Sequence, residues 1–186
     1  MKFTHWILNH TPKWFIALAV IVFVLFGAFV LPAQSAKAEA YSGEAGSPDT
    51  NFFYKPHDLL SMAEAYGPAG RAAYVRARFT FDLIFPFVYG VFLTATISGL
   101  LRSLHVDHTR WAVLLLAPFL GVVCDFAENI GAATVIGRYP SPTPLLTTLT
   151  PYLSFLKWFF VVASFLILIC GIVILFLTRM LKSKSS

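Results

Sequence analysis

Charged residues are scarce in this chain of 186 residues. Asp, Glu, Lys and Arg make up 12% of it and hydrophobic residues 58%, whereas soluble domains carry roughly a quarter charged residues. This shortage excludes an ordinary soluble domain and indicates a membrane protein. The formal net charge of +5 does not indicate a nucleic-acid partner, because the basic residues lie at the tails and beside apolar runs.

Cysteine and the common catalytic motifs are equally sparse. Cys124 and Cys170 lie inside apolar runs and form no CxxC pair, so we expect them to pack rather than to form a disulfide or bind zinc. The sequence has no glycine-rich phosphate loop, nucleophile elbow or HExxH motif. The segment His105-Val106-Asp107-His108 contains metal donors, but without a third cluster it is expected to be a solvated loop. We predict no metal and no cofactor.

Long apolar runs are what the chain has in abundance. A membrane-spanning helix needs about 20 mostly apolar residues, and four such runs occur, at 14–31, 79–101, 111–136 and 151–177. The predicted fold is therefore all-α, a polytopic four-helix bundle whose solvent is the lipid bilayer. Residues 79–178 would form a three-helix transmembrane core, followed by a basic tail at 179–186.

The N-terminal part, residues 1–31, has two interpretations. Lys2 and Lys13 precede its apolar run, and Gln34-Ser35-Ala36-Lys37-Ala38 offers the small residues of a signal peptidase site. The apolar run is longer than the core of a typical signal peptide, so we favour a retained signal anchor. Cleavage would instead leave three spans and an exported N-terminus.

Lysine and arginine near the helix ends predict the orientation, because the basic side of a membrane protein faces the cytoplasm. The basic residues that share one side of the four spans are Lys2, Lys13, Arg102, Arg110, Arg179, Lys182 and Lys184. The other side has Arg138 in its short loop, and its long segment is left out because long segments cross regardless of charge. We therefore expect a multi-pass protein of the inner (plasma) membrane with both termini cytoplasmic.

Residues 32–78 are expected to form an extracytoplasmic segment of two parts. Residues 32–51 are rich in Ala, Ser, Gly and Glu and predict a flexible linker. The run from Pro56 to Tyr66 predicts a short amphipathic helix on the outer surface. From Arg71 the pattern looks continuously helical into span two, and the proline-rich turn at 138–144 is expected to close over the mouth of a pocket.

Ionisable residues inside membrane spans are costly and by default mark a functional site. Asp82 lies about one turn inside the second span, Arg78 precedes it by one turn, and Tyr89 follows on the same face. Pro86 lacks the amide that would bond the Asp82 carbonyl, so a kink is expected there. This helix would bring a carboxylate, a cation and a phenol together.

The third and fourth spans carry polar groups at a matching depth. Asp125, Glu128 and Asn129 are spaced i, i+3 and i+4, so they share one face of the third span, roughly 20 to 25 Å from its start at 1.5 Å per residue. Thr150 is expected to cap the fourth span, which places Lys157 about 9 Å from the outer end of that span. The sequence therefore predicts an outward-facing pocket in which carboxylates face Lys157.

Two classes of function fit this pocket. In the first, it binds a small amphipathic or lipid-like molecule, and the carboxylates pair with a cation or transfer a proton, as in an isomerisation. In the second, the charges form an ion-pair network in a structural or assembly subunit, where Lys157 neutralises Asp125 or Asp82. Its partner would be another membrane protein or a second copy of the chain.

Two further classes are less favoured. A divalent cation suits the oxygen ligands of Asp82, Asp125, Glu128 and Asn129, but Lys157 in the same pocket opposes it. A small proton-coupled transporter lacks support because no inverted repeat is visible in the sequence.

Two resemblances rest on these same residues. The segments Arg78-Phe-Thr-Phe-Asp82-Leu-Ile-Phe-Pro86-Phe-Val-Tyr89-Gly90 and Cys124-Asp125-Phe-Ala-Glu128-Asn129 resemble a family of small, uncharacterised bacterial four-span membrane proteins, which implies no activity. Asp82 and Pro86, with Thr143-Pro144-Leu145 and Tyr152 further along, resemble the EXPERA group of emopamil-binding sterol isomerases and the sigma-2 receptor.

The EXPERA resemblance implies a four-helix protein with cytoplasmic termini. It also implies intramembrane carboxylates that line a pocket for an apolar amine or a sterol. The chain departs from that group because its first span has no acidic residue and its outer segment is longer. The resemblance is one of architecture, and architecture does not establish function.

Overall fold

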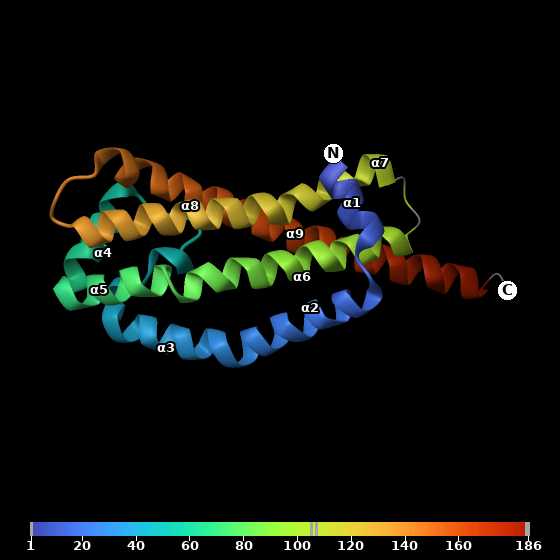
Figure 1. The fold of residues 1–186 in the computed structure, drawn as a ribbon, viewed down its shortest axis with the longest axis horizontal. Helices are drawn as coiled ribbons and strands as arrows, with labels where there is room; N and C mark the ends of the chain where they lie inside the picture. The colour runs from blue at the N-terminus through green and yellow to red at the C-terminus, as the bar shows by residue number, and fades with distance from the viewer. Residues whose placement is uncertain (1, 105, 107, 185–186) are drawn as a thin grey trace.

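The chain forms an elongated bundle of helices (Figure 1). The computed structural model describes residues 2–104, 106 and 108–184, and these contain no strand. Four helical stretches are long and apolar enough to cross a membrane: Lys13–Ala45, Gly67–Ser103, Ala112–Arg138 and Pro144–Ser183. The prediction of an all-α bundle with four apolar helices is confirmed, and by this fold the chain is a multi-pass membrane protein.

The elements follow one another along the chain with short connections. The N-terminal half contains α1 (Lys2–His10), α2 (Lys13–Leu25), the π-helical turn η1 (Phe26–Val30), α3 (Leu31–Ser42), η2 (Gly43–Ala45), η3 (Pro48–Thr50), α4 (Pro56–Ala65) and α5 (Gly67–Arg78). The C-terminal half contains α6 (Phe81–Ser103), α7 (His108–Trp111), η4 (Ala112–Leu115), α8 (Leu116–Arg138) and α9 (Pro144–Lys184).

The first span is longer than the sequence predicted. Helix continues from Lys13 to Ser42, so the expectation of a flexible linker is wrong for residues 32–42. Between α2 and α3 the Leu31 amide bonds the Phe26 carbonyl five residues back, because Pro32 has no amide and its ring would clash with an α-helical carbonyl four residues earlier. Such π turns bend helices, and α2 and α3 together bow away from α6 (Figure 1).

The short helix α4 is amphipathic, as its sequence pattern predicted, and its apolar face packs inside the bundle. Its apolar residues Leu59, Met62 and Ala63 are buried and pack against α8 and α9. The bundle itself therefore covers the apolar face of this helix, and the location of the helix at the outer surface stays a prediction. The helix from Arg71 is not continuous into span two, since α5 ends at Arg78 and α6 begins at Phe81.

Helices α8 and α9 form the closest pair in the bundle. A Cβ added at Gly131 of α8 would lie 2.4 Å from the Thr150 hydroxyl oxygen of α9, so the absence of a side chain allows this approach. Helix α9 starts at Pro144 and runs through Pro151. The prediction that Thr150 caps the fourth span is wrong, because its hydroxyl bonds the Leu146 carbonyl inside the helix.

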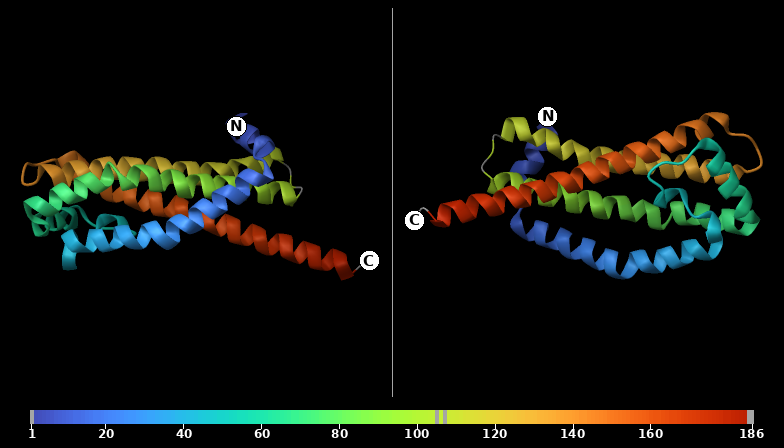
Figure 2. Two further views of the ribbon diagram at one scale, coloured as in Figure 1. Left: turned by 60° about the horizontal axis from the view of Figure 1, so that its bottom comes forward. Right: turned by 180° about the vertical axis from the view of Figure 1, so that it is seen from behind.

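Both chain ends and the α6–α7 connection lie at one end of the bundle (Figures 1 and 2). Helices α4 and α5 and the connection from α8 to α9 lie at the other. The basic residues that the sequence placed on one side therefore share one end of the fold. We call these the terminal end and the distal end.

The contact at Gly131 makes a first prediction about stability. Gly131→Ala should lower the unfolding temperature in detergent, with a loss on the order of 1 to 3 kcal/mol, because the methyl group overpacks a filled interface. Gly27→Ala is the matched control, since a Cβ there meets nothing within 4 Å. Equal unfolding temperatures for the two variants would contradict close α8–α9 packing.

Candidate functional site

A buried ion pair joins the two most tightly packed helices. The Lys157 ammonium on α9 lies 2.5 Å from Oε2 of Glu128 on α8, and Glu128 is fully buried. The Tyr54 hydroxyl donates to Oε1 of Glu128 at 3.4 Å. Lys157 therefore pairs with Glu128, not with Asp125 or Asp82 as the network hypothesis expected. An uncompensated charge at this depth would be strongly destabilising, so each partner requires the other.

Asp125 is held by neutral hydrogen-bond donors. The Tyr89 hydroxyl of α6 donates to Oδ2 of Asp125 at 2.9 Å, and the Asn129 side-chain amide donates to Oδ1 at 3.0 Å. Tyr89 and Asn129 thus hold this carboxylate in place from two different helices. Within the part of the chain that the structure describes, Asp125 has no ion-pair partner.

Arg78 is the second buried cation of the cluster. Its guanidinium contacts Oδ2 of Asp82 at 2.8 Å, one helical turn away, and also pairs with Asp49. It donates to Oδ1 of Asn129 at 3.5 Å and lies 4.6 Å from the ring centroid of Tyr74. A guanidinium has five donors in a planar fork, so one Arg78 side chain binds groups from three separate segments.

Asp49 comes from the segment that the sequence assigned to a flexible linker. The Ser47 hydroxyl donates to its carboxylate at 2.7 Å, and its side chain is 23% exposed. Burial alone would raise the pKa of Asp49, but Arg78, Lys157 and the Ser47 hydroxyl outweigh it and hold the pKa below its usual value. Asp49 is therefore an ionised member of the cluster at neutral pH.

The pKa of the Tyr54 hydroxyl is raised by its surroundings, whereas that of Asp49 is lowered. Burial, followed by the neighbouring charges of Glu128 and Asp49, raises its pKa well above the usual value for a phenol. Its hydroxyl therefore keeps its proton and acts as a donor to Glu128.

A cavity of about 510 Å³ opens beside these charges. It lies between the bowed α2–α3 helix on one side and α6, α8 and α9 on the other. The charged residues of its lining are Lys37, Glu39, Asp49, Arg78, Asp82, Asp125 and Lys157. Its other polar residues include Tyr89 and Trp158, and the apolar ones include Phe23, Phe81, Phe85, Val161 and Phe165. One part of the wall is charged and the other is aromatic or aliphatic.

The structure brings together all seven predicted site residues, but in two layers. Arg78, Asp82, Tyr89, Asp125 and Lys157 line the cavity. Glu128 and Asn129 are absent from that lining and contact the others from behind. The proline-rich turn at 138–144 does not close over the cavity. The segment from Tyr41 to Thr50 lines its distal side instead.

Sequence reasoning missed Asp49, Tyr54 and Trp158. The turn signal Ser47-Pro48-Asp49 marked a loop, but nothing in it indicated that the loop folds back onto the spans. Tyr54 and Trp158 look like ordinary aromatic residues near a membrane interface. A buried arginine that needs more than one carboxylate was the available clue to Asp49.

No family model, curated protein or solved structure matches this chain. The class of protein therefore rests on the fold, which is that of a multi-pass membrane protein, and on the charged cavity inside it. Among the described residues, no group of three or more His, Cys, Asp or Glu side chains is arranged to hold a metal ion.

The pairing of Asp49 with Arg78 makes a prediction about pH. Asp49→Asn should destabilise the protein at neutral pH by on the order of 2 kcal/mol, because Arg78 loses a charged partner. A carboxyl whose pKa is lowered by folding stabilises the fold above its unfolded pKa of about 4 and loses that effect as the pH falls through the folded pKa. The difference in unfolding temperature between wild type and variant should therefore vanish in strong acid.

Glu44→Gln provides the control for that measurement. Glu44 is exposed and lies in the same segment, so its variant should unfold like the wild type at every pH. A pH-independent difference for Asp49→Asn would show that this pairing does not stabilise the fold.

Proposed function

We propose that this chain binds a small amphipathic molecule in the cavity between α2–α3 and the other spans. The observation that carries this proposal is the division of the cavity wall into a charged part and an apolar part. A volume of about 510 Å³ falls in the ordinary range for small-molecule sites, roughly 300 to 1,000 Å³. An apolar body would lie against Phe23, Phe85 and Phe165, with its polar head at Asp82 and Asp125.

The charges of the cluster favour one kind of head group. Four carboxylates, Asp49, Asp82, Asp125 and Glu128, share two cations, Arg78 and Lys157. Asp125 accepts hydrogen bonds but has no counter-ion among the described residues. A cationic or hydrogen-bond-donating head would supply what Asp125 lacks, whereas an anionic head would add to the excess negative charge.

The Trp158 side chain supports a head group that both donates and accepts hydrogen bonds. The indole N–H of Trp158 is buried and has no hydrogen-bond partner among the described residues. A buried donor without a partner costs about 1 to 3 kcal/mol, and an acceptor on the ligand would remove that cost. An amine or hydroxyl compound meets both needs, and the EXPERA resemblance implies ligands of that type. Proton transfer by Asp82 or Asp125 to such a ligand is the enzymatic version of the proposal.

The orientation belongs to this proposal as well. We place the protein in the inner (plasma) membrane with both termini in the cytoplasm and the first helix retained as a signal anchor. The charged cavity would then face outward. Reporter fusions at the C-terminus test this directly, since a cytoplasmic fluorescent reporter should be active there and an exported phosphatase should not.

Asp125→Asn tests the proposed binding function. The amide keeps the shape of the side chain but removes its charge, so the protein should fold and lose a bound amine or hydroxyl compound. Native mass spectrometry of gently purified protein should detect a retained small molecule in the wild type and little in the variant. Glu64→Gln, on the exposed side of α4, should retain it. Equal retention in all three proteins would refute binding at Asp125.

A structural or assembly subunit is the second candidate function. Two observations favour it: the Glu128–Lys157 pair is buried between helices, and the C-terminal part of α9 exposes Ile172, Phe176 and Leu181. In a bilayer that exposed face is available to lipid or to a helix of a partner.

A double-mutant cycle separates the two candidates. Glu128→Gln and Lys157→Met should each destabilise the protein by about 3 to 5 kcal/mol, because each leaves an unpaired buried charge. If the pair is purely structural, the double variant should recover most of this stability and still retain the small molecule. Recovered stability with lost retention would instead assign Lys157 to the binding site.

A further inference from the structure

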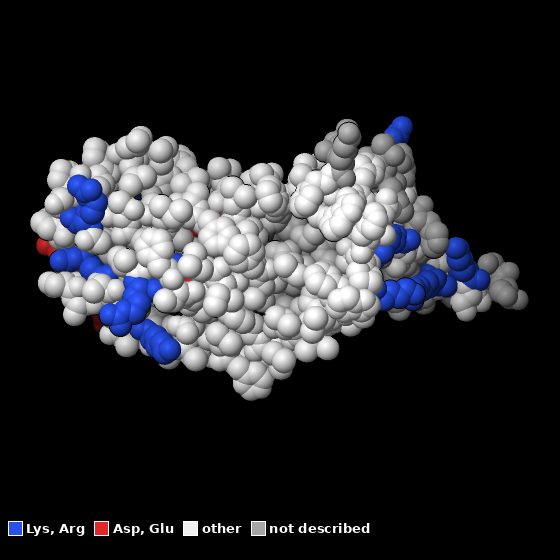
Figure 3. Space-filling view, viewed as in Figure 1, with Lys and Arg blue, Asp and Glu red and all other residues white. Residues whose placement is uncertain are grey.

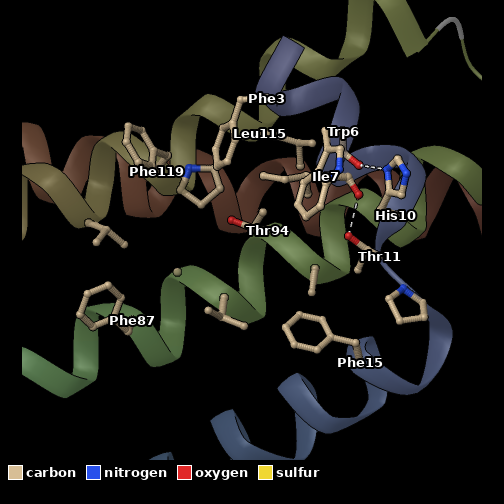
Figure 4. A pocket seen from close by; sticks show the side chains of 16 residues that line it. Phe3, Trp6, Ile7, His10, Thr11, Phe15, Phe87, Thr94, Leu115 and Phe119 are labelled. Atoms are coloured by element: carbon tan, nitrogen blue, oxygen red, sulfur yellow. Dashed lines mark hydrogen bonds between the residues drawn. The ribbon is translucent and has the colours of Figure 1, made fainter. Parts of the chain in front are cut away.

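A second cavity of about 460 Å³ lies near the terminal end of the bundle (Figure 4). Helix α1 and the first turn of α2 cover one side of it, and α6 and α8 form its walls. Its lining residues include Phe3, Trp6, Phe15, Phe87, Val91, Thr94, Leu115 and Phe119. None of them belongs to the charged cavity described above.

The interior of this cavity is almost entirely apolar. The polar groups at its rim are already used within the chain, since the Thr11 hydroxyl donates to the Ile7 carbonyl at 2.7 Å and Nδ1 of His10 lies 2.9 Å from the Trp6 carbonyl. Figure 4 shows both contacts at the edge of the cavity. Thr94 adds one hydroxyl to walls of α6 and α8 that are otherwise apolar, so the interior fits an occupant that is mostly hydrocarbon.

The depth of the cavity matches one leaflet of a bilayer. Its lining on α6 runs from Ala95 to Phe87, roughly 12 Å at 1.5 Å per residue, and one leaflet contains about 15 Å of hydrocarbon. Trp6, Trp14 and Trp111 are exposed around the terminal end, and exposed tryptophans mark the interface of a membrane. The cavity thus runs from the interface inward.

The charge at the mouth is basic. Lys13 is exposed next to the lining residue Pro12, and the Arg102 guanidinium donates to the Thr11 carbonyl. Among the described side chains, the Lys and Arg residues of the terminal end are Lys13, Arg102, Arg110, Arg179 and Lys182. Figure 3 shows blue without red on the visible face of this end. Basic groups beside spans attract anionic lipid head groups.

We infer that this cavity holds one acyl chain of an anionic phospholipid, whose phosphate lies near Lys13 and Arg102. The apolar interior and its depth of about one leaflet fit the acyl chain. The basic residues at the mouth fit the phosphate. Helix α1 and the first turn of α2 would cover one side of the acyl chain. The site is separate from the proposed amphipathic-ligand site, and neither depends on the other.

The test uses delipidated protein in detergent and two defined probes, dioleoyl phosphatidylglycerol and dioleoyl phosphatidylcholine. Native mass spectrometry should show one retained phosphatidylglycerol molecule and weaker retention of phosphatidylcholine. Lys13→Gln should weaken phosphatidylglycerol retention by about fivefold, the effect of one basic residue near a membrane surface. Val91→Phe should abolish retention by filling the cavity.

Leu83→Phe is the matched control for Val91→Phe. Leu83 is also an exposed residue of α6 but lies outside the cavity lining, so its variant should keep the lipid. If Val91→Phe does not fold, Thr94→Leu adds apolar bulk at a neighbouring lining position instead. Equal retention of the two lipids, unchanged retention in the filled variant, or a dimer that the filled variant dissociates would each overturn the inference.

Discussion

The requirement of Arg78 for counter-charge is the constraint on which most of the distal end depends. A guanidinium is always charged, so its burial demands carboxylates within contact distance. Asp82 is supplied by the following helical turn. Asp49 has to be brought from a segment nearly thirty residues earlier, and this draws the chain between α3 and α4 back onto the bundle.

Several features of the fold follow because the segment between α3 and α4 folds back onto Arg78. Once residues 46–51 lie against Arg78, α4 starts close to α8 and α9 and buries its apolar face there. Tyr54 then reaches Glu128, which is itself neutralised by Lys157. Asn129 links the ion pairs of Arg78 to Asp125, because it contacts both Arg78 and Asp125. A change at one end of this network is therefore expected to reach the other.

The bend of the first span supplies the space beside the network. Pro32 cannot donate a helical hydrogen bond, and the π turn that accommodates it displaces α3 from α6. A straight helix would pack along α6 and cover Asp82 and Asp125. The bowed helix leaves a cavity whose charged wall is built by α6, α8 and α9 and whose apolar wall continues toward the terminal end.

The two ends of the bundle differ in the chemistry they offer to ligands. At the distal end, the carboxylates of the cluster outnumber its cations and lie beside a partly open cavity. At the terminal end, basic residues lie beside a cavity whose lining is mostly apolar. The first arrangement suits a compact head with a hydrogen to donate, and the second suits a hydrocarbon chain with an anionic head. The two proposed sites therefore differ in the charge of the head group that they would accept.

The sequence by itself determined the four apolar helices, the shared end of the basic residues and the face on which Asp125, Glu128 and Asn129 lie. These features depend on composition and on the period of one helix, which are local properties. The i,i+4 spacing of Arg78 and Asp82 already favours their pairing, but the partners of Lys157 and Asp49 depend on the tertiary structure. Lys157 pairs with Glu128 because α8 and α9 approach closely at Gly131, and Asp49 joins the cluster because the chain folds back over a distance that no periodicity encodes.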